Sequence, residues 1–149
     1  MSLKDKITAD MKDALRNKHS GRLEAIRLLR AAIQRRELDT REELDDVDVV
    51  AVVHKLIKQG QDAAEQFDTG GRRDLADKER DQVDQYKEYL PTPLTADELK
   101  QMTQEAIADT GATSIRDMGK VMALLKVQVH GRADLGELSL IVKTALTAG

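Results

Sequence analysis

Hydrophobic residues recur every three or four positions through residues 1–90, which is the spacing of helices that bury one face. Leu3, Ile7, Met11 and Leu15 form the first such run. Polar residues and glycine separate this run from the later ones. The pattern therefore predicts helices over residues 3–18, 21–38, 46–67 and 72–90.

Residue types that are typical of helix ends stand at the limits of these runs. Ser2 can cap the first helix, and Asp45 or Asp46 can cap the third. Gly70 or Gly71 can adopt the left-handed conformation in which many helices end. These end signals support the helices that the hydrophobic spacing predicts.

A boundary is expected at Pro91 and Pro93, because proline disfavours a helical conformation of the residue before it. Thr95 and Glu98 then have the spacing of a capping box, which starts a new helix. The following spacing predicts three short helices, over residues 95–109, 114–129 and 134–146. We therefore expect two domains, an N-terminal helical domain over residues 1–91 and a C-terminal three-helix domain over residues 94–149.

The composition also favours helices. The aromatic residues are Phe67, Tyr86 and Tyr89, so aliphatic side chains and methionine have to build the core. Such a core suits packed helices better than a β-sandwich or a barrel, and the expected fold class is all-α. Cysteine is absent, which excludes disulfides and thiolate chemistry. Because the sequence shows neither a signal peptide nor a long apolar run, we expect a cytoplasmic protein.

Two glycines lie inside predicted helices, at the same place in a repeated pattern. The pattern reads "DMGKV" at residues 117–121 and "DLGEL" at residues 134–138, and it places Gly119 and Gly136 in second helical turns. Glycine inside a helix costs about 1 kcal/mol relative to alanine, so a compensating role is expected. Close crossing of a neighbouring helix is the favoured explanation. Close approach of a ligand or an RNA phosphate is the alternative.

The net charge of −3 gives no overall attraction to nucleic acid, although local groups of cations exist. Residues 16–36 are rich in basic side chains, whereas residues 42–48 are acidic. The candidates for contact with RNA phosphates are Arg27, Arg30 and Arg35 in the second helix, and Lys120, Lys126, Arg132 and Lys143 in the C-terminal domain. For both groups a solvated surface is the favoured interpretation, and the arginines of the second helix would then pair with the acidic run. Since few aromatic residues are present, recognition of RNA by shape and backbone is expected, rather than reading of bases.

Candidates for catalysis are few. His19, His54 and His130 lie in different segments, and no second histidine stands three or four positions from any of them, as a helical metal site would need. No Gly-x-Ser-x-Gly motif surrounds a serine. We expect structural roles for the histidines, and a solvated helix start for the acidic run rather than a magnesium site. No catalytic residue, metal or cofactor is predicted.

Several segments together resemble the GatB/YqeY family. They are "ITADMKDALR", "RLEAIRLLRAAIQRRELD", "DLADKERDQVDQYKEYLP", "DMGKVMALLK" and "GRADLGELSLIVK", and they follow one another along nearly the whole chain. The resemblance implies a small, all-helical bacterial protein. It also implies that the C-terminal domain is similar to the tail of the B subunit of tRNA amidotransferase, which helps to hold tRNA.

Individual residues match this family pattern. The matches to the tail are Gly119, Val121, Met122, Gly131, Arg132, Ala133 and Asp134, and Lys120 matches the stand-alone members. The expected structural motif comprises Gly119, Gly131 and Asp134, which match the tail, together with Gly136 from the repeated glycine pattern. The chain departs from the pattern at "KVQVHG", where many members have a more basic turn, and at Glu137, where lysine is frequent. Both departures remove positive charge from the proposed RNA face.

Three hypotheses about function follow. The first is a non-catalytic accessory module that associates with tRNA or an aminoacyl-tRNA complex. The second is a helical adaptor that binds a protein partner through a groove around Met118, Met122 and Leu125. The third and weakest is an amidotransferase-like carbon-nitrogen ligase with glutamine as amide donor, which the resemblance alone implies.

Overall fold

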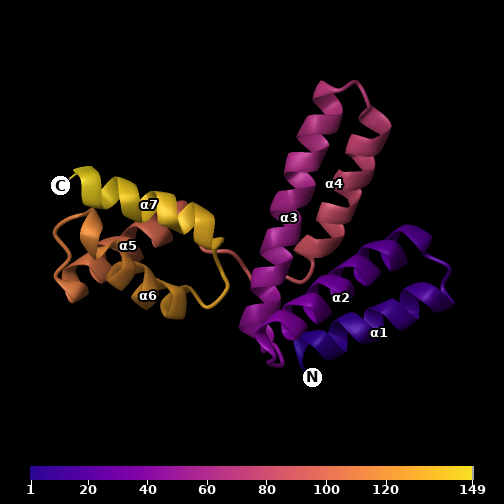
Figure 1. The fold of residues 1–149 in the computed structure, drawn as a ribbon, viewed down its shortest axis with the longest axis horizontal. Helices are drawn as coiled ribbons and strands as arrows, with labels where there is room; N and C mark the ends of the chain where they lie inside the picture. Colours follow the sequence, from indigo (N-terminus) through magenta and orange to yellow (C-terminus); the bar gives the residue numbers. More distant parts are fainter. Residues whose placement is uncertain (149) are drawn as a thin grey trace. The chain divides into compact units, whose positions relative to one another are not determined.

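The computed structural model describes residues 1–148, and no strand occurs in this range. Its regular elements are seven α-helices and one short 3-10 turn, η1 (Figure 1). They are α1 (Leu3–Arg16), α2 (Ser20–Thr40), α3 (Asp46–Thr69), α4 (Arg73–Lys87), α5 (Ala96–Thr110), η1 (Ile115–Asp117), α6 (Met118–Val129) and α7 (Leu135–Ala148). The predicted all-α fold is confirmed. The chain divides into two compact units, Met1–Leu90 and Pro91–Gly149, and each unit has a hydrophobic core of its own.

The ends of the helices follow the predicted signals. The Ser2 hydroxyl accepts a hydrogen bond from the Asp5 N–H at 3.1 Å, and the Asp5 carboxylate accepts one from the Ser2 N–H, so the two form a capping box. Asp45 caps α3 by accepting a hydrogen bond from the Asp48 N–H at 2.9 Å. After α3, the residue with a left-handed backbone is Gly71, with φ of 76°.

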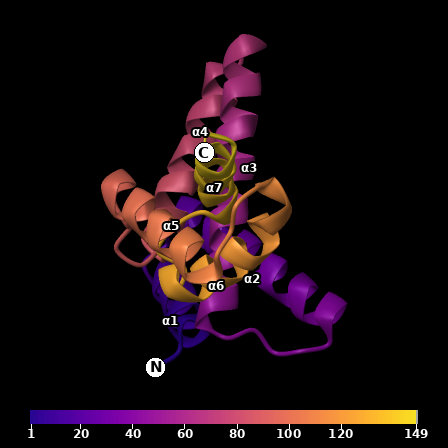
Figure 2. The ribbon, with the colours of Figure 1, turned by 90° about the vertical axis from the view of Figure 1, so that its left-hand side faces the viewer.

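Two helical hairpins, α1 with α2 and α3 with α4, make the first unit. The α3 and α4 helices lie side by side in Figure 1 and in the turned view of Figure 2. Aliphatic side chains dominate the core, as the composition indicates. The buried core residues are Ile7, Ala14, Ala25, Ile26, Leu29, Ile33, Leu44, Val49, Val53, Ile57, Val83, Tyr86 and Tyr89.

Both tyrosines are buried in this core. The Tyr89 hydroxyl donates a hydrogen bond to Asp10 Oδ2 at 2.6 Å, across 79 positions of sequence. Burial and this carboxylate raise the pKa of Tyr89 above its usual value, and burial raises the pKa of Tyr86 to about 12. The Tyr89 hydroxyl therefore stays protonated at neutral pH and ties the chain after α4 to α1.

Close approach of two helices occurs at Gly60, which is buried in α3. A Cβ atom placed on Gly60 would lie 2.6 Å from Val83 Cγ2 in α4, which is shorter than van der Waals contact allows. The missing side chain therefore lets α3 and α4 pack closely. Gly60 stands outside the repeated glycine pattern, and only the tertiary structure identifies its role.

The helix-crossing explanation for Gly119 is wrong. Gly119 is exposed, and a Cβ atom placed on it would meet nothing within 4 Å. It is the second residue of α6, because the chain from Ser114 first forms η1 and α6 begins only at Met118. Gly136 is likewise exposed and is the second residue of α7. Both glycines lie in first turns and not in second turns, so the cost of glycine in a helix interior does not apply to them.

The second unit packs α5, α6 and α7 around its own core. Its buried hydrophobic residues are Leu99, Ala106, Val121, Leu125, Val129, Ala133, Leu138, Val142 and Leu146. Met118 and Met122 pack against this core, and Leu125 is 0% exposed. The cluster that the adaptor hypothesis treats as a groove therefore belongs to the core.

Candidate nucleic-acid interface

The three candidate lysines of the second unit point into solvent, as Lys100 on α5 also does. Lys120 and Lys126 lie on α6 and Lys143 lies on α7, and all three are exposed. Their ammonium groups make no ion pair and no hydrogen bond with any residue in the range 1–148. These cations are therefore free to meet an anionic partner.

The α6 and α7 helices repeat one surface arrangement. Lys126 follows Gly119 by seven positions, and Lys143 follows Gly136 by the same interval, so each pair lies about two turns apart on one helix face. The outward residue between each pair is small or apolar, Ala123 on α6 and an exposed leucine on α7. Each helix thus presents a lysine about two turns after an exposed glycine on the same face.

The turn before α6 is held by Asp117. Its carboxylate accepts hydrogen bonds from the N–H groups of Thr113 at 2.9 Å and Ser114 at 3.3 Å. These bonds hold the pKa of Asp117 below its usual range, and the charge of nearby Lys120 acts in the same direction. The acid nearest to Lys120 in sequence is thus already bonded to the backbone of the turn.

Arg132 takes part in the fold of the second unit. Its side-chain Nε donates a hydrogen bond to the Thr92 carbonyl at 2.8 Å, and its own carbonyl accepts one from the Leu94 N–H at 3.0 Å. Arg132 therefore holds the segment before α5 against the turn between α6 and α7. The contact of Arg132 with RNA stays a prediction. Its guanidinium already has a hydrogen-bond partner within the second unit, the Thr92 carbonyl.

Replacement of Arg132 by alanine is expected to lower the free energy of unfolding of the second unit by about 0.5–1.5 kcal/mol, the usual net value of such a bond. Amide hydrogen exchange at Leu94 should become faster, because its acceptor is no longer held in place. Lys126→Ala, which removes an exposed and unpaired cation, is the matched control and should leave both quantities unchanged. If the Leu94 amide exchanged its hydrogen at the same rate in wild type and in Arg132→Ala, this structural role would be contradicted.

The remaining motif residues of the second unit also shape its backbone. Gly131 has φ of 79° and His130 has φ of 46°, so the turn after α6 runs through two left-handed residues. Asp134 Oδ2 accepts a hydrogen bond from the Glu137 N–H at 3.2 Å, which caps the start of α7. Both motif positions therefore have local structural explanations.

The candidate arginines of α2 differ in their availability. Arg27 and Arg35 are exposed, and neither makes an ion pair or side-chain hydrogen bond within residues 1–148. Arg30 is half-buried, and its Nη1 lies 3.1 Å from the Met11 sulfur on α1. Arg22, which the prediction omitted, bonds Glu88 at 2.9 Å and belongs to the contact of α2 with α4.

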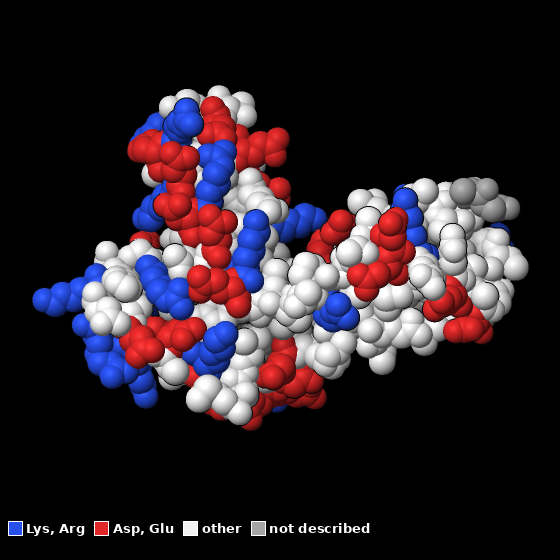
Figure 3. Space-filling view, turned by 180° about the vertical axis from the view of Figure 1, so that it is seen from behind, with Lys and Arg blue, Asp and Glu red and all other residues white. Residues whose placement is uncertain are grey.

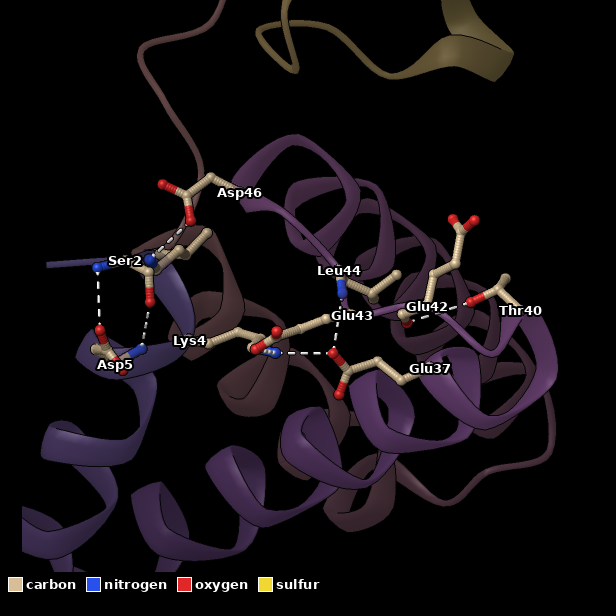
Figure 4. Close-up of polar contacts among 10 residues, drawn as sticks. Ser2, Lys4, Asp5, Glu37, Thr40, Glu42, Glu43, Leu44 and Asp46 are labelled. Carbon is tan, nitrogen blue, oxygen red and sulfur yellow. Dashed lines mark hydrogen bonds and ion pairs between the residues drawn. The ribbon is translucent and has the colours of Figure 1, made fainter.

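The acidic run, residues 42–48, forms its ion pairs and hydrogen bonds with groups other than these arginines. Lys4 Nζ lies between the carboxylates of Glu37, at 2.7 Å, and Glu43, at 3.0 Å (Figure 4). The Leu3 N–H donates to Asp46 Oδ1 at 2.9 Å. The partnership of Lys4 raises its pKa and lowers that of Glu37. The acidic run makes no ion pair with the candidate arginines of α2 within residues 1–148, so that pairing is wrong, although Arg27 and Arg35 are exposed; Glu43 and Asp46 bond α1 instead.

Charges of both signs are interspersed over the face of the molecule that Figure 3 shows. Figure 3 shows Lys and Arg side chains among Asp and Glu side chains on one face, without a continuous basic surface. No group of three or more His, Asp or Glu side chains within residues 1–148 is arranged to hold a metal ion. None of the helices in that range is long and apolar enough to cross a membrane. Any interface with nucleic acid must therefore be a local one.

The chain is similar to known proteins along most of its length. The profile of the family described as "Yqey-like protein" matches residues 4–146. A curated relative, the "Altered inheritance of mitochondria protein 41, mitochondrial" of Pyrenophora tritici-repentis, is 29% identical over 126 residues, which cover 81% of this chain and 70% of that protein. The family match spans both units and confirms the resemblance to YqeY. The chain belongs to the family of Yqey-like proteins.

Proposed function

We propose that this protein is a non-catalytic, tRNA-associated accessory module whose second unit contacts the RNA backbone through Lys120, Lys126 and Lys143. The observation that carries the proposal is that α6 and α7 together present three exposed lysines that make no ion pair within residues 1–148. A lysine ammonium forms charge-assisted hydrogen bonds with phosphate oxygens and releases counterions on binding. Lysines that already held carboxylate partners would have to break those bonds first.

The surface around these lysines favours contact with a folded RNA. The aromatic residues Phe67, Tyr86 and Tyr89 all lie in the first unit, so the second unit has no platform on which bases can stack. The exposed Gly119 and Gly136 leave room for another backbone to approach the starts of α6 and α7. This combination fits recognition of phosphates and shape, as in structured RNA.

Salt dependence of binding tests the proposal. We expect purified protein to bind fluorescent tRNA, and three phosphate contacts predict that affinity falls roughly 20- to 40-fold between about 50 mM and 200 mM salt. A single-stranded RNA of equal length should bind more weakly, because it lacks the folded shape. Fluorescence anisotropy measures both affinities. Binding that is independent of salt, or equal for the two RNAs, would contradict the proposal.

A further inference from the structure

The α2 helix has a second apolar surface that faces away from the core. Leu28 is 47% exposed and Leu38 is 79% exposed, although the buried side of α2 already supplies four residues to the core. At 100° per residue, Leu28, Ala31, Arg35 and Leu38 fall within a sector of roughly 80°. We name the exposed sector formed by Arg27, Leu28, Ala31, Arg35 and Leu38 the outer face of α2. An ordinary surface helix has one apolar stripe, which faces the core, whereas α2 has exposed apolar side chains on its opposite side as well.

The outer face carries positive charge as well as leucines. Arg27 and Arg35 are exposed and unpaired within residues 1–148. The acids at its edges are Glu24, whose carboxylate lies 3.3 Å from Lys78, and Asp39, which makes no ion pair with Arg35. A partner with complementary charge would therefore carry negative groups opposite Arg27 and Arg35.

A second copy of the chain does not meet this requirement. In a symmetric antiparallel pairing of two outer faces centred on Ala31, Arg27 of one copy lies opposite Arg35 of the other. Like charges in such an arrangement repel each other. Charge thus disfavours self-association through this face and favours a different, acidic partner.

The leucines distinguish between classes of acidic partner. Phosphate groups of RNA would satisfy Arg27 and Arg35 but would leave Leu28 and Leu38 in contact with water. A helix that carries apolar residues flanked by carboxylates would cover the leucines and pair with the arginines together. The interval from Arg27 to Leu38 corresponds to about three helical turns, a length that a short partner helix can match.

We infer that the outer face of α2 is a docking site for an acidic amphipathic helix of another protein. Apolar residues of that helix, at spacings of three and four positions, pack on Leu28, Ala31 and Leu38. Its Asp or Glu residues pair with Arg27 and Arg35. The inference does not rest on the proposed tRNA binding, because Lys120, Lys126 and Lys143 lie in the second unit and the outer face of α2 lies in the first.

Site-specific photocrosslinking in cells of the protein's own species tests the inference. The full chain carries benzoylphenylalanine in place of Leu38, and mass spectrometry identifies the crosslinked segment. The expected product joins position 38 to a segment whose sequence has helical apolar spacing flanked by acids. The charge-reversed variant Arg27→Glu with Arg35→Glu should lower the yield of this product about tenfold or more.

The control places the same photocrosslinker at Leu15, which is 57% exposed on α1 and lies outside the outer face of α2. This position should not yield the acidic segment. Both exchanged arginines are exposed, so circular dichroism of the charge-reversed variant should match that of wild type. Crosslinks from position 38 only to RNA or lipid, the same products from positions 38 and 15, or no product at all would overturn the inference.

Discussion

Gly60→Ala is expected to lower the free energy of unfolding of the first unit by about 1–3 kcal/mol, the usual cost of overpacking. Alanine is the better helix former, so helix propensity alone predicts a gain of stability. The new Cβ atom would lie 2.6 Å from Val83 Cγ2. Val83 is 4% exposed and its branched side chain is rigid at χ1, so α3 and α4 have to separate. Urea unfolding followed by circular dichroism measures the change.

Two further variants make this prediction specific. Gly119→Ala introduces the same methyl group at an exposed position with no neighbour within 4 Å, and its stability should equal or slightly exceed that of wild type. In the Val83→Ala background, the Gly60→Ala substitution should lower the free energy of unfolding by less than it does in wild type, because the clashing Cγ2 is gone. Additive effects of the two exchanges, or a Gly60→Ala protein more stable than wild type, would contradict the close approach of α3 and α4.

Local sequence signals predicted the helices and their starts well. Ser2 and Asp45 cap helices where the pattern places them, and Thr95 forms the expected capping box with Glu98. Such caps bond groups within three positions, so the residue types alone indicate them. The start of α6 was harder to predict, because Ser114 also forms a box with Asp117 but starts only a 3-10 turn.

Roles that depend on distant partners could not be predicted in this way. Gly60 and Gly119 are the same residue type within helices, and only the position of Val83, which is distant in sequence, makes one of them essential for packing. Arg132 is as basic as the lysines around it, yet Thr92, 40 positions away, accepts its hydrogen bond. The predicted cations of the candidate interface therefore separate into free and engaged groups only in the tertiary structure.

Charge reversal of the three candidate lysines of α6 and α7 is expected to have the largest effect on function. The variant Lys120→Glu, Lys126→Glu, Lys143→Glu replaces three attractive contacts with three repulsive ones. Each lost contact removes a released counterion, and each new carboxylate repels phosphate, so the affinity for tRNA should fall about 100-fold or more at low salt. Stability should change little, since the three ammonium groups have no partners in the described chain.

A matched control separates specific contacts from net charge. Lys55, Lys58 and Lys87 are exposed lysines of the first unit that make no ion pair within residues 1–148. Their exchange to glutamate changes the net charge of the protein by the same amount. Because long-range attraction depends on net charge, this variant should lose only a small part of the affinity.

The most direct test of the proposed function is the affinity of the purified full chain for tRNA, measured by fluorescence anisotropy at about 50 mM salt, where phosphate contacts are strong. Wild type, the Lys120, Lys126, Lys143 variant and the matched control are compared after circular dichroism has shown that all three are folded. We expect tight binding by wild type and the control, and at least about 100-fold weaker binding by the lysine variant. Equal loss of affinity in both variants, or no tRNA binding by wild type, would contradict the proposed function.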